Sequence, residues 1–95
     1  MVALLVEVVL DTVERIPAGR VLSYGDVAEE VGLRSARPVG LVLHRHGAAV
    51  PWHRVVMADG RPAPRKAVEQ LRRLRAEGTP LVGSRVDMRS ARWSR

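Results

Sequence analysis

A pair of helix boundary signals in the first half of the chain constrains the fold most. Ser23 and Asp26 form the Ser-x-x-Asp pattern with which many helices begin. The serine hydroxyl accepts a hydrogen bond from a backbone N–H that has no partner within the helix. Gly32 follows at the distance where a short helix ends. We therefore predict a helix over residues 24–31.

A second helix start follows directly. Ser35 is a helix-capping residue, and Pro38 suits a first helical turn because its missing N–H would have no partner there. We therefore predict a helix over residues 36–45. Two short helices joined across residues 32–35 are typical of a helix-turn-helix, whose second helix often enters a groove of DNA. Many enzymes, however, contain such a hairpin for packing alone.

The remaining elements follow from hydrophobic periodicity and turn signals. Apolar residues recur with a helical period over 2–16 and over 65–77, which predicts two further helices. The proline-interrupted apolar segment 50–56 predicts a buried loop leading into one short strand. A short strand is expected at 85–88, and residues 89–95 are expected to be flexible. The fold class is therefore mainly α, a small winged helix-turn-helix-like domain with a little β structure.

Composition narrows the possible partners. Ninety-five residues predict a single domain spanning 1–95, and sixteen basic against ten acidic residues give a net charge of +6. Such an excess favours an anionic partner, most often nucleic acid, although an arginine-rich genome would raise the same count. The absence of cysteine excludes disulfides and thiol nucleophiles. No apolar run reaches the length of a membrane span, so we expect no membrane partner and a cytoplasmic protein, nucleoid-associated if bacterial.

Three motifs then occur in order with similar spacing to a known family. They are Val-Leu-Ser-Tyr-Gly-Asp-Val-Ala at 21–28, Ser-Ala-Arg-Pro-Val-Gly at 35–40 and Pro-Trp-His-Arg-Val at 51–55. Over roughly residues 2–88 the chain resembles the DNA-binding domain of O6-alkylguanine-DNA alkyltransferases. In that family the third motif reads Pro-Cys-His-Arg-Val, and its cysteine accepts the alkyl group. With Trp52 at that position, the chain resembles the alkyltransferase-like proteins, which bind alkylated DNA without repairing it.

The chemistry of alkyl transfer supports the same conclusion. Direct displacement of an alkyl group needs a strong nucleophile, and an activated thiolate is suitable whereas the indole of Trp52 is not. We therefore predict that the protein is not an enzyme. His53 and Glu77, which match the family's His and Glu, would have no thiol to activate, so we interpret them as a structural contact and Arg54 as a brace of the loop. An enzyme with a residual His53–Glu77 activity is the alternative.

The resemblance also implies how DNA would be held. Arg37 would enter the base stack, and Tyr24 would press on the phosphate 3′ to a flipped nucleotide. The simpler alternatives are a phosphate contact for Arg37 and a tyrosine packed between helices for Tyr24. The small residues Ser35, Ala36 and Gly40 would let the second helix approach the minor groove. The predicted DNA-binding set is Tyr24, Ser35, Ala36, Arg37 and Gly40.

A lesion pocket is expected around the third motif. Trp52 offers a large apolar face to a flipped base, although a tryptophan buried in the core is the alternative. Arg65 would reach the base face, unless it faces solvent beside Lys66. The predicted pocket set is Tyr24, Val50, Pro51, Trp52, His53 and Arg65. Relative to the family, residues 41–50 form a shortened loop that lacks an asparagine, so the brace of the second helix is left open.

The sequence therefore predicts a monomer that binds double-stranded DNA containing O6-alkylguanine by nucleotide flipping and marks it for nucleotide excision repair proteins. No cofactor is expected. His44, His46 and His53 do not predict a metal site, because no cysteine accompanies them and the first two point to different faces of a helix. The alternative is a helix-turn-helix transcriptional regulator or a nucleoid-type DNA-binding protein.

Overall fold

The computed structural model describes residues 2–94, and its elements agree with the mainly α fold class predicted from sequence. The α-helices are α1 (Val2–Glu14), α2 (Tyr24–Glu30), α3 (Arg37–His46), α4 (Ala67–Ala76) and α5 (Met88–Ala91). Single 3₁₀ turns form η1 (Gly47–Ala49), η2 (Trp52–Arg54) and η3 (Pro64–Lys66). The strands are β1 (Leu22–Ser23), β2 (Val55–Val56), β3 (Leu81–Val82) and β4 (Arg85–Val86).

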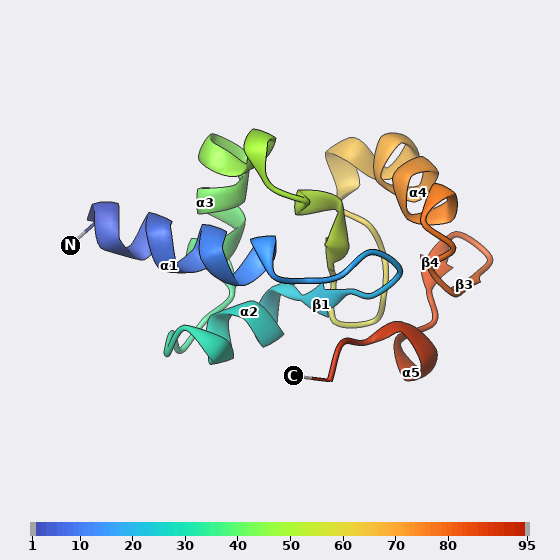
Figure 1. Cartoon of the computed structure of the whole chain (residues 1–95), viewed down its shortest axis with the longest axis horizontal. Coiled ribbons are helices and arrows are strands. Elements are labelled where there is room, and N and C mark those ends of the chain that lie inside the picture. The colour runs from blue at the N-terminus through green and yellow to red at the C-terminus, as the bar shows by residue number, and fades with distance from the viewer. Residues whose placement is uncertain (1, 95) are drawn as a thin grey trace.

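The molecule has two packed halves, which Figure 1 shows side by side. In one half α1, α2 and α3 bury a cluster centred on Val9, Val13, Leu22 and Val39. In the other half Leu74 of α4 packs with Val56 and with residues near the C-terminus. Because α2 and α3 rest on α1, their positions are set by burial of its apolar face.

A short parallel sheet joins the two halves. Leu22 pairs with Val55 and Ser23 with Val56, so the segment before α2 lies beside the segment after η2. Farther along the chain, β3 and β4 form an antiparallel hairpin that turns at Gly83, where φ is 61°. The predicted strand at 85–88 is therefore shorter, and its partner β3 was not predicted. The hairpin is the small wing that the fold class anticipated.

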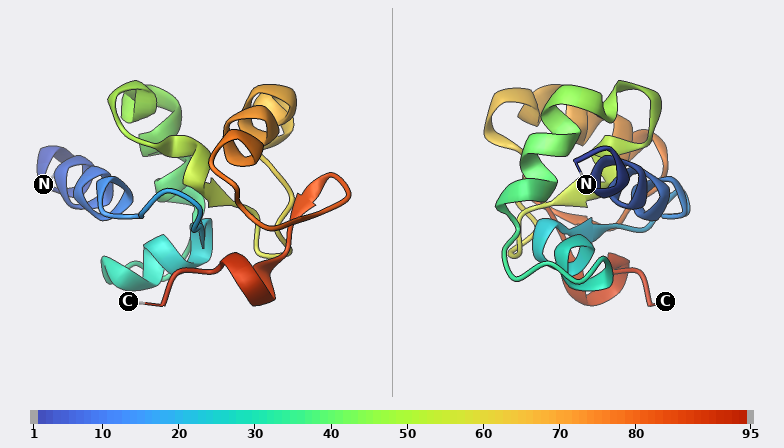
Figure 2. Two further views of the ribbon diagram at one scale, coloured as in Figure 1. Left: turned by 45° about the vertical axis from the view of Figure 1, so that its right-hand side comes forward. Right: turned by 90° about the vertical axis from the view of Figure 1, so that its left-hand side faces the viewer.

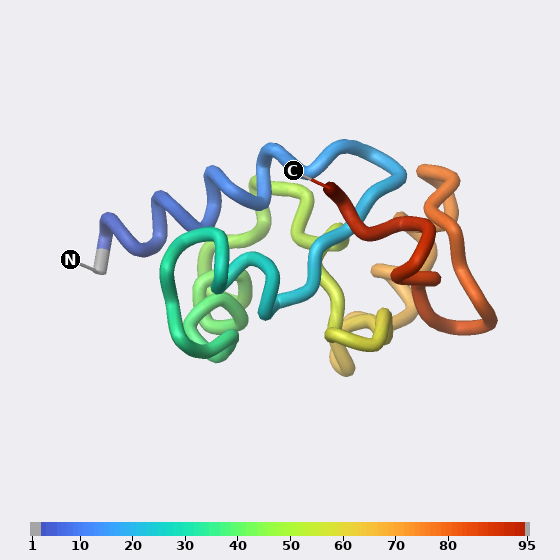
Figure 3. The backbone as a smooth tube through the Cα atoms, turned by 90° about the horizontal axis from the view of Figure 1, so that it is seen from below, coloured from blue at the N-terminus to red at the C-terminus, as the bar shows by residue number. Residues whose placement is uncertain are grey.

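The C-terminal segment differs from its expected flexibility. Residues 88–91 form α5, and Ala91 is fully buried. The N–H of Trp93 donates to the carbonyl of Val21 at 2.8 Å, and Trp93 packs against the first core cluster. Figure 3 shows this segment passing close to the chain that follows α1. Backbone pairing with Val21 thus holds residues 91–93 in place; flexibility stays a prediction for residue 94, and Arg95 lies outside the described residues.

Two smaller expectations also need correction. The loop expected at 41–50 is shorter, because residues 41–46 belong to α3, in agreement with the helix predicted over 36–45, and η1 follows at once. No glycine or proline interrupts them before Gly47, whose N–H still donates to Leu43. Val68, one of the apolar residues in the helix predicted over 65–77, is 86% exposed. The inward positions of α4 are those of Gln70 and Leu74 instead.

Candidate nucleic-acid interface

A capping box at the start of α2 positions Tyr24. Ser23 Oγ accepts a hydrogen bond from the N–H of Asp26, and Asp26 Oδ2 accepts one from the N–H of Ser23, each at 3.0 Å. The Arg92 guanidinium also binds the Asp26 carboxylate. Burial alone would raise the pKa of Asp26, but the hydrogen bonds from Arg92 and Ser23 hold it below its usual value. Tyr24 is therefore the first residue of a helix whose start is held both by the capping box and by the ion pair between Arg92 and Asp26.

Tyr24 itself is half-buried, and burial raises the pKa of its hydroxyl. The phenol is therefore a neutral hydrogen-bonding group near pH 7.

Helix α3 begins at Arg37. The N–H of Arg37 donates to Ser35 Oγ at 3.1 Å, and Pro38 lies in the first turn as predicted. The N-cap residue is Ala36 rather than Ser35, so Ser35 accepts this hydrogen bond from the position before the N-cap. Arg37 is exposed, and among residues 2–94 its side chain has no hydrogen-bond or carboxylate partner. The helix thus presents an unpaired guanidinium to solvent at its N-terminal end.

Gly40 lies one turn after Ala36 on α3. A methyl group built at Gly40 would meet no atom within 4 Å. Packing inside the protein therefore does not require glycine here, and its backbone conformation is ordinary for a helix. The position leaves the α3 surface open to close approach from outside.

A hollow of about 420 Å³ lies between α3 and η3, and we call it the near hollow. This volume falls within the range of small-ligand pockets. Tyr24 of α2, Trp52 of η2 and Arg65 of η3 all line it, although they are far apart in sequence. Gly40, His44 and Arg45 of α3 form another side. Figure 2 shows α3 and α4 standing on the same side of the molecule, with residues 52–56 between them.

Three residues expected in this pocket lie elsewhere. Val50, Pro51 and His53 are not among the residues that line the near hollow. Val50 packs against the first core cluster, and His53 is 7% exposed and directed towards Glu77. In the same turn, Trp52 lines the hollow while His53 is held by Glu77.

Trp52 is half-buried at the edge of the hollow, which fits a wall better than a core residue. Its ring meets that of His53 edge-on, with 6.1 Å between centroids. Lys66 Nζ lies 4.9 Å from the centroid of the indole ring, and Arg73 Cζ lies 5.3 Å from it. Cations at this range attract the electron-rich face of an indole, so both stabilise the position of Trp52.

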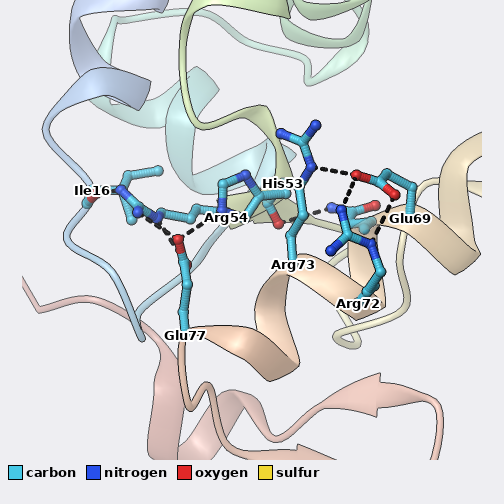
Figure 4. A network of polar contacts seen from close by, with 8 residues as sticks. Ile16, His53, Arg54, Glu69, Arg72, Arg73 and Glu77 are labelled. Atoms are coloured by element: carbon cyan, nitrogen blue, oxygen red, sulfur yellow. Dashed lines mark hydrogen bonds and ion pairs between the residues drawn. The ribbon is translucent and has the colours of Figure 1, made fainter.

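Behind Trp52, a polar network ties the loop to the end of α4 (Figure 4). His53 Nε2 lies 3.0 Å from Glu77 Oε2, the contact that the sequence analysis expected. Arg54 donates to both oxygens of Glu77, at 3.0 and 2.6 Å, and to the carbonyl of Ile16 at 2.8 Å. The Arg54 guanidinium, with His53, lowers the pKa of Glu77 to about 2 despite its partial burial. Glu77 is therefore ionised at neutral pH, and Arg54 braces the loop as expected.

Gln70 completes this support and was not predicted. Its side chain is fully buried, donates to the carbonyls of His53 and Val55, and accepts from the N–H of Ala63. One amide thus fixes both the turn that carries Trp52 and the segment that leads to Arg65. The only sequence signal was a glutamine one turn before Leu74 on the inward side of a helix, which is weak.

Lys66 and Arg73 are the other residues that sequence reasoning missed. Lys66 was considered only as a neighbour of Arg65, and no contact of Arg73 was predicted. Their contacts with Trp52 depend on where η3 and α4 place them, which no local pattern shows.

No metal or membrane element is found in the described part of the chain. Within residues 2–94, no three His, Asp or Glu side chains gather closely enough to hold a metal ion. No helix in the same range has the length and apolar character needed to cross a membrane.

The order of these motifs and the polar network around residue 53 agree with one known family. Residues 5–79 match the family described as 6-O-methylguanine DNA methyltransferase, DNA binding domain. The chain belongs to this family. A relative in Escherichia coli K12, named DNA base-flipping protein, is 43% identical over 88 residues, covering 86% of this chain and 68% of that protein. Alkyltransferase-like protein 1 of Schizosaccharomyces pombe is 47% identical over 55 residues, covering 55% of this chain and 51% of that protein.

A solved family structure has the same fold. Atl1 of S. pombe, crystallised with damaged DNA containing O6-carboxymethylguanine, superposes with a TM-score of 0.88 at 28% identity. The match covers 98% of this chain and 97% of that one. A second structure of the S. pombe protein with DNA gives a TM-score of 0.86 at 30% identity. At this coverage the likeness extends over both halves of the molecule.

Proposed function

We propose that this protein recognises O6-alkylguanine in duplex DNA by flipping the damaged nucleotide into the near hollow, and that it does not remove the alkyl group. The observation that carries the proposal is the meeting of Tyr24, Trp52 and Arg65 around one hollow beside α3. Relatives named for base flipping and for alkyltransferase-like activity support it.

Charge on this side of the molecule suits a phosphate backbone. Arg37, Arg45, Arg65 and Lys66 have no carboxylate partner among the described residues. Unpaired cations attract DNA over a range set by salt and contribute affinity without reading sequence. The net charge of +6 acts in the same direction.

Nucleotide flipping needs a group that fills the gap in the stack and another that steers the backbone. Arg37 is suited to the first role because it is exposed at the start of α3 and tied to nothing in the protein. Tyr24 is suited to the second, since it lines the hollow and its neutral hydroxyl can bond a phosphate. The small side chains of Ser35, Ala36 and Gly40 would let the backbone of α3 approach the minor groove closely.

The lesion would be distinguished from guanine in two steps. Alkylation at O6 removes the N1 proton and weakens pairing with cytosine, so extrusion costs less before any contact with the protein. In the hollow, the face of Trp52 packs against the alkyl group and Arg65 lies against the base. A cation over an aromatic face contributes about 0.5–2 kcal/mol, depending on how well water is excluded.

Alkyl transfer is excluded by chemistry. We assign Trp52 to the position where the family's motif has its acceptor cysteine, and the chain contains no cysteine at all. Indole nitrogen is not a nucleophile strong enough to displace an alkyl group from an ether oxygen. His53 is occupied by Glu77 and has no thiol to deprotonate. A protein that binds a lesion without removing it can recruit other repair proteins to the site. We assign nucleotide excision repair as the process that it recruits.

Two measurements test the proposal. Equilibrium binding to matched duplexes should be at least tenfold tighter with O6-methylguanine than with guanine. Equal affinity would favour an ordinary helix-turn-helix regulator or nucleoid-type binder. Intact-protein mass spectrometry after incubation with O6-methylguanine DNA should show no added methyl group, and a stoichiometric adduct would show that the protein is an enzyme.

A further inference from the structure

Trp52 is a shared wall between two hollows. A second hollow of about 710 Å³, lined by Trp52 and by residues of α4, adjoins the first, and we call it the far hollow. Both hollows are lined by Ala48, Trp52, Pro64, Arg65 and Lys66, so they meet along this border. A group longer than a methyl that extends from the near hollow across this border would therefore reach the far hollow.

The far hollow is positively charged at that border. Lys66 Nζ and Arg73 Cζ both lie over the indole ring, at 4.9 and 5.3 Å from its centroid. Lys66 has no carboxylate partner among residues 2–94, so its charge is uncompensated. The border between the two hollows therefore carries the ammonium group of Lys66 beside Trp52.

The carboxylate of this hollow does not cancel that charge. Glu69 accepts hydrogen bonds from Arg72 and from Arg73, whose guanidinium groups lower its pKa to about 2 (Figure 4). One ionised carboxylate is thus shared between two arginines. Its position fixes Arg73 beside Trp52 and leaves Lys66 unopposed.

We infer that the far hollow is a subsite for the anionic end of an O6-carboxyalkyl group. Its carbon chain would pass over the apolar face of Trp52, and its carboxylate would pair with Lys66, assisted by Arg73. This inference rests on the proposed function, because the guanine must first enter the near hollow. A DNA phosphate is the other source of an anion for the same cations, and the two sources differ in a measurable way.

The experiment compares four duplexes of one sequence, carrying guanine, O6-methylguanine, O6-carboxymethylguanine or O6-carbamoylmethylguanine. The last two differ by a charge at nearly constant size. The wild-type protein should bind the carboxymethyl duplex up to about fivefold more tightly than the carbamoylmethyl duplex, as expected for a partly exposed ion pair. Raising the salt concentration should reduce this ratio.

Three variants identify the cation responsible. Lys66→Met keeps an apolar stem against Trp52 and removes the charge, so the ratio of carboxymethyl to carbamoylmethyl affinity should fall to about one. Lys66→Arg should keep the ratio. Arg75→Met is the matched control, since Arg75 is an exposed cation of α4 that lines neither hollow.

The outcomes separate the possibilities. Equal weakening of all four duplexes by Lys66→Met would assign Lys66 to a phosphate and overturn the inference. A wild-type ratio of one, with O6-methylguanine still preferred over guanine, would overturn the subsite but leave the proposed function standing. No preference for O6-methylguanine would mean that the proposed function itself fails.

Discussion

Two arginines of this protein, Arg54 and Arg37, lie in contrasting environments. Arg54, behind Trp52, is mostly buried and donates to both oxygens of Glu77 and to the carbonyl of Ile16. Arg37, at the start of α3, is exposed and has no partner among the described residues. The same side chain therefore holds the fold together in one place and is left free in the other.

The contrast follows from solvation. In a partly buried site a guanidinium is desolvated, so it is stable only with a carboxylate and carbonyls arranged around it. On the surface, water solvates the charge, and an internal ion pair would add little. An exposed, unpaired arginine therefore does not lower the stability of the fold and remains available to an external anion. Arg54, by contrast, cannot leave its site without leaving the carboxylate of Glu77 unpaired in a partly buried position.

The largest effect should come from breaking the buried network. Glu77→Gln leaves the Arg54 charge uncompensated, and we expect the free energy of unfolding to fall by about 2–3 kcal/mol in urea denaturation. Because the folded pKa of Glu77 is about 2, its contribution is fully present above the unfolded value of about 4.3 and is lost as the pH falls towards 2. The variant should lack this acid-dependent loss.

The exposed pair at Glu69 provides the control for that measurement. Glu69→Gln removes a carboxylate with a similarly lowered pKa, but one whose side chain is 42% exposed, against 20% for Glu77. Its stability should be indistinguishable from wild type. A loss as large as that of Glu77→Gln would mean that burial does not explain the difference between the two environments.

The next effect concerns the free arginine. Arg37→Ala should lower affinity for the O6-methylguanine duplex by roughly 10- to 100-fold and leave unfolding unchanged, because the side chain contacts nothing in the protein. A fluorescent base reporter opposite the lesion should show reduced flipping. If the variant instead weakens damaged and undamaged duplexes equally and flattens the salt dependence, Arg37 is a phosphate contact only.

The smallest effects are expected at Gly40, where one substitution should change both folding stability and DNA affinity. Gly40→Ala places a methyl group in open space on α3, so thermal unfolding should show a gain of about 0.5–1 kcal/mol from helix propensity. DNA affinity should fall severalfold, because the methyl group obstructs approach of the helix to the groove. A variant that gains stability and retains full affinity would show that α3 does not approach DNA closely at Gly40.

Much of the helical fold could be predicted because its signals are local. The box of Ser23 and Asp26, the stop at Gly32 and the start at Pro38 each act within one helical turn, so α2 and α3 match their predicted ranges closely. The contact between His53 and Glu77 was also anticipated, although from the motif and not from spacing.

The candidate site was only partly predictable. Tyr24, Trp52 and Arg65 meet as expected, but Val50, Pro51 and His53 do not face the near hollow. Which way a side chain points in a 3₁₀ turn depends on the support behind it. Here that support includes the amide of Gln70, whose hydrogen bonds reach residues 7 to 17 positions away.

By itself, the sequence determined the absence of a thiol acceptor, the excess of positive charge and the start of each helix around the central turn, because these depend on residue type and on neighbours a few positions away. Only the tertiary structure decided which cations are free. Arg92 reaches Asp26 across 66 positions, and Lys66 and Arg73 meet on one indole ring. Such pairings depend on the path of the whole backbone, since desolvation and ion pairing act between groups that folding brings together.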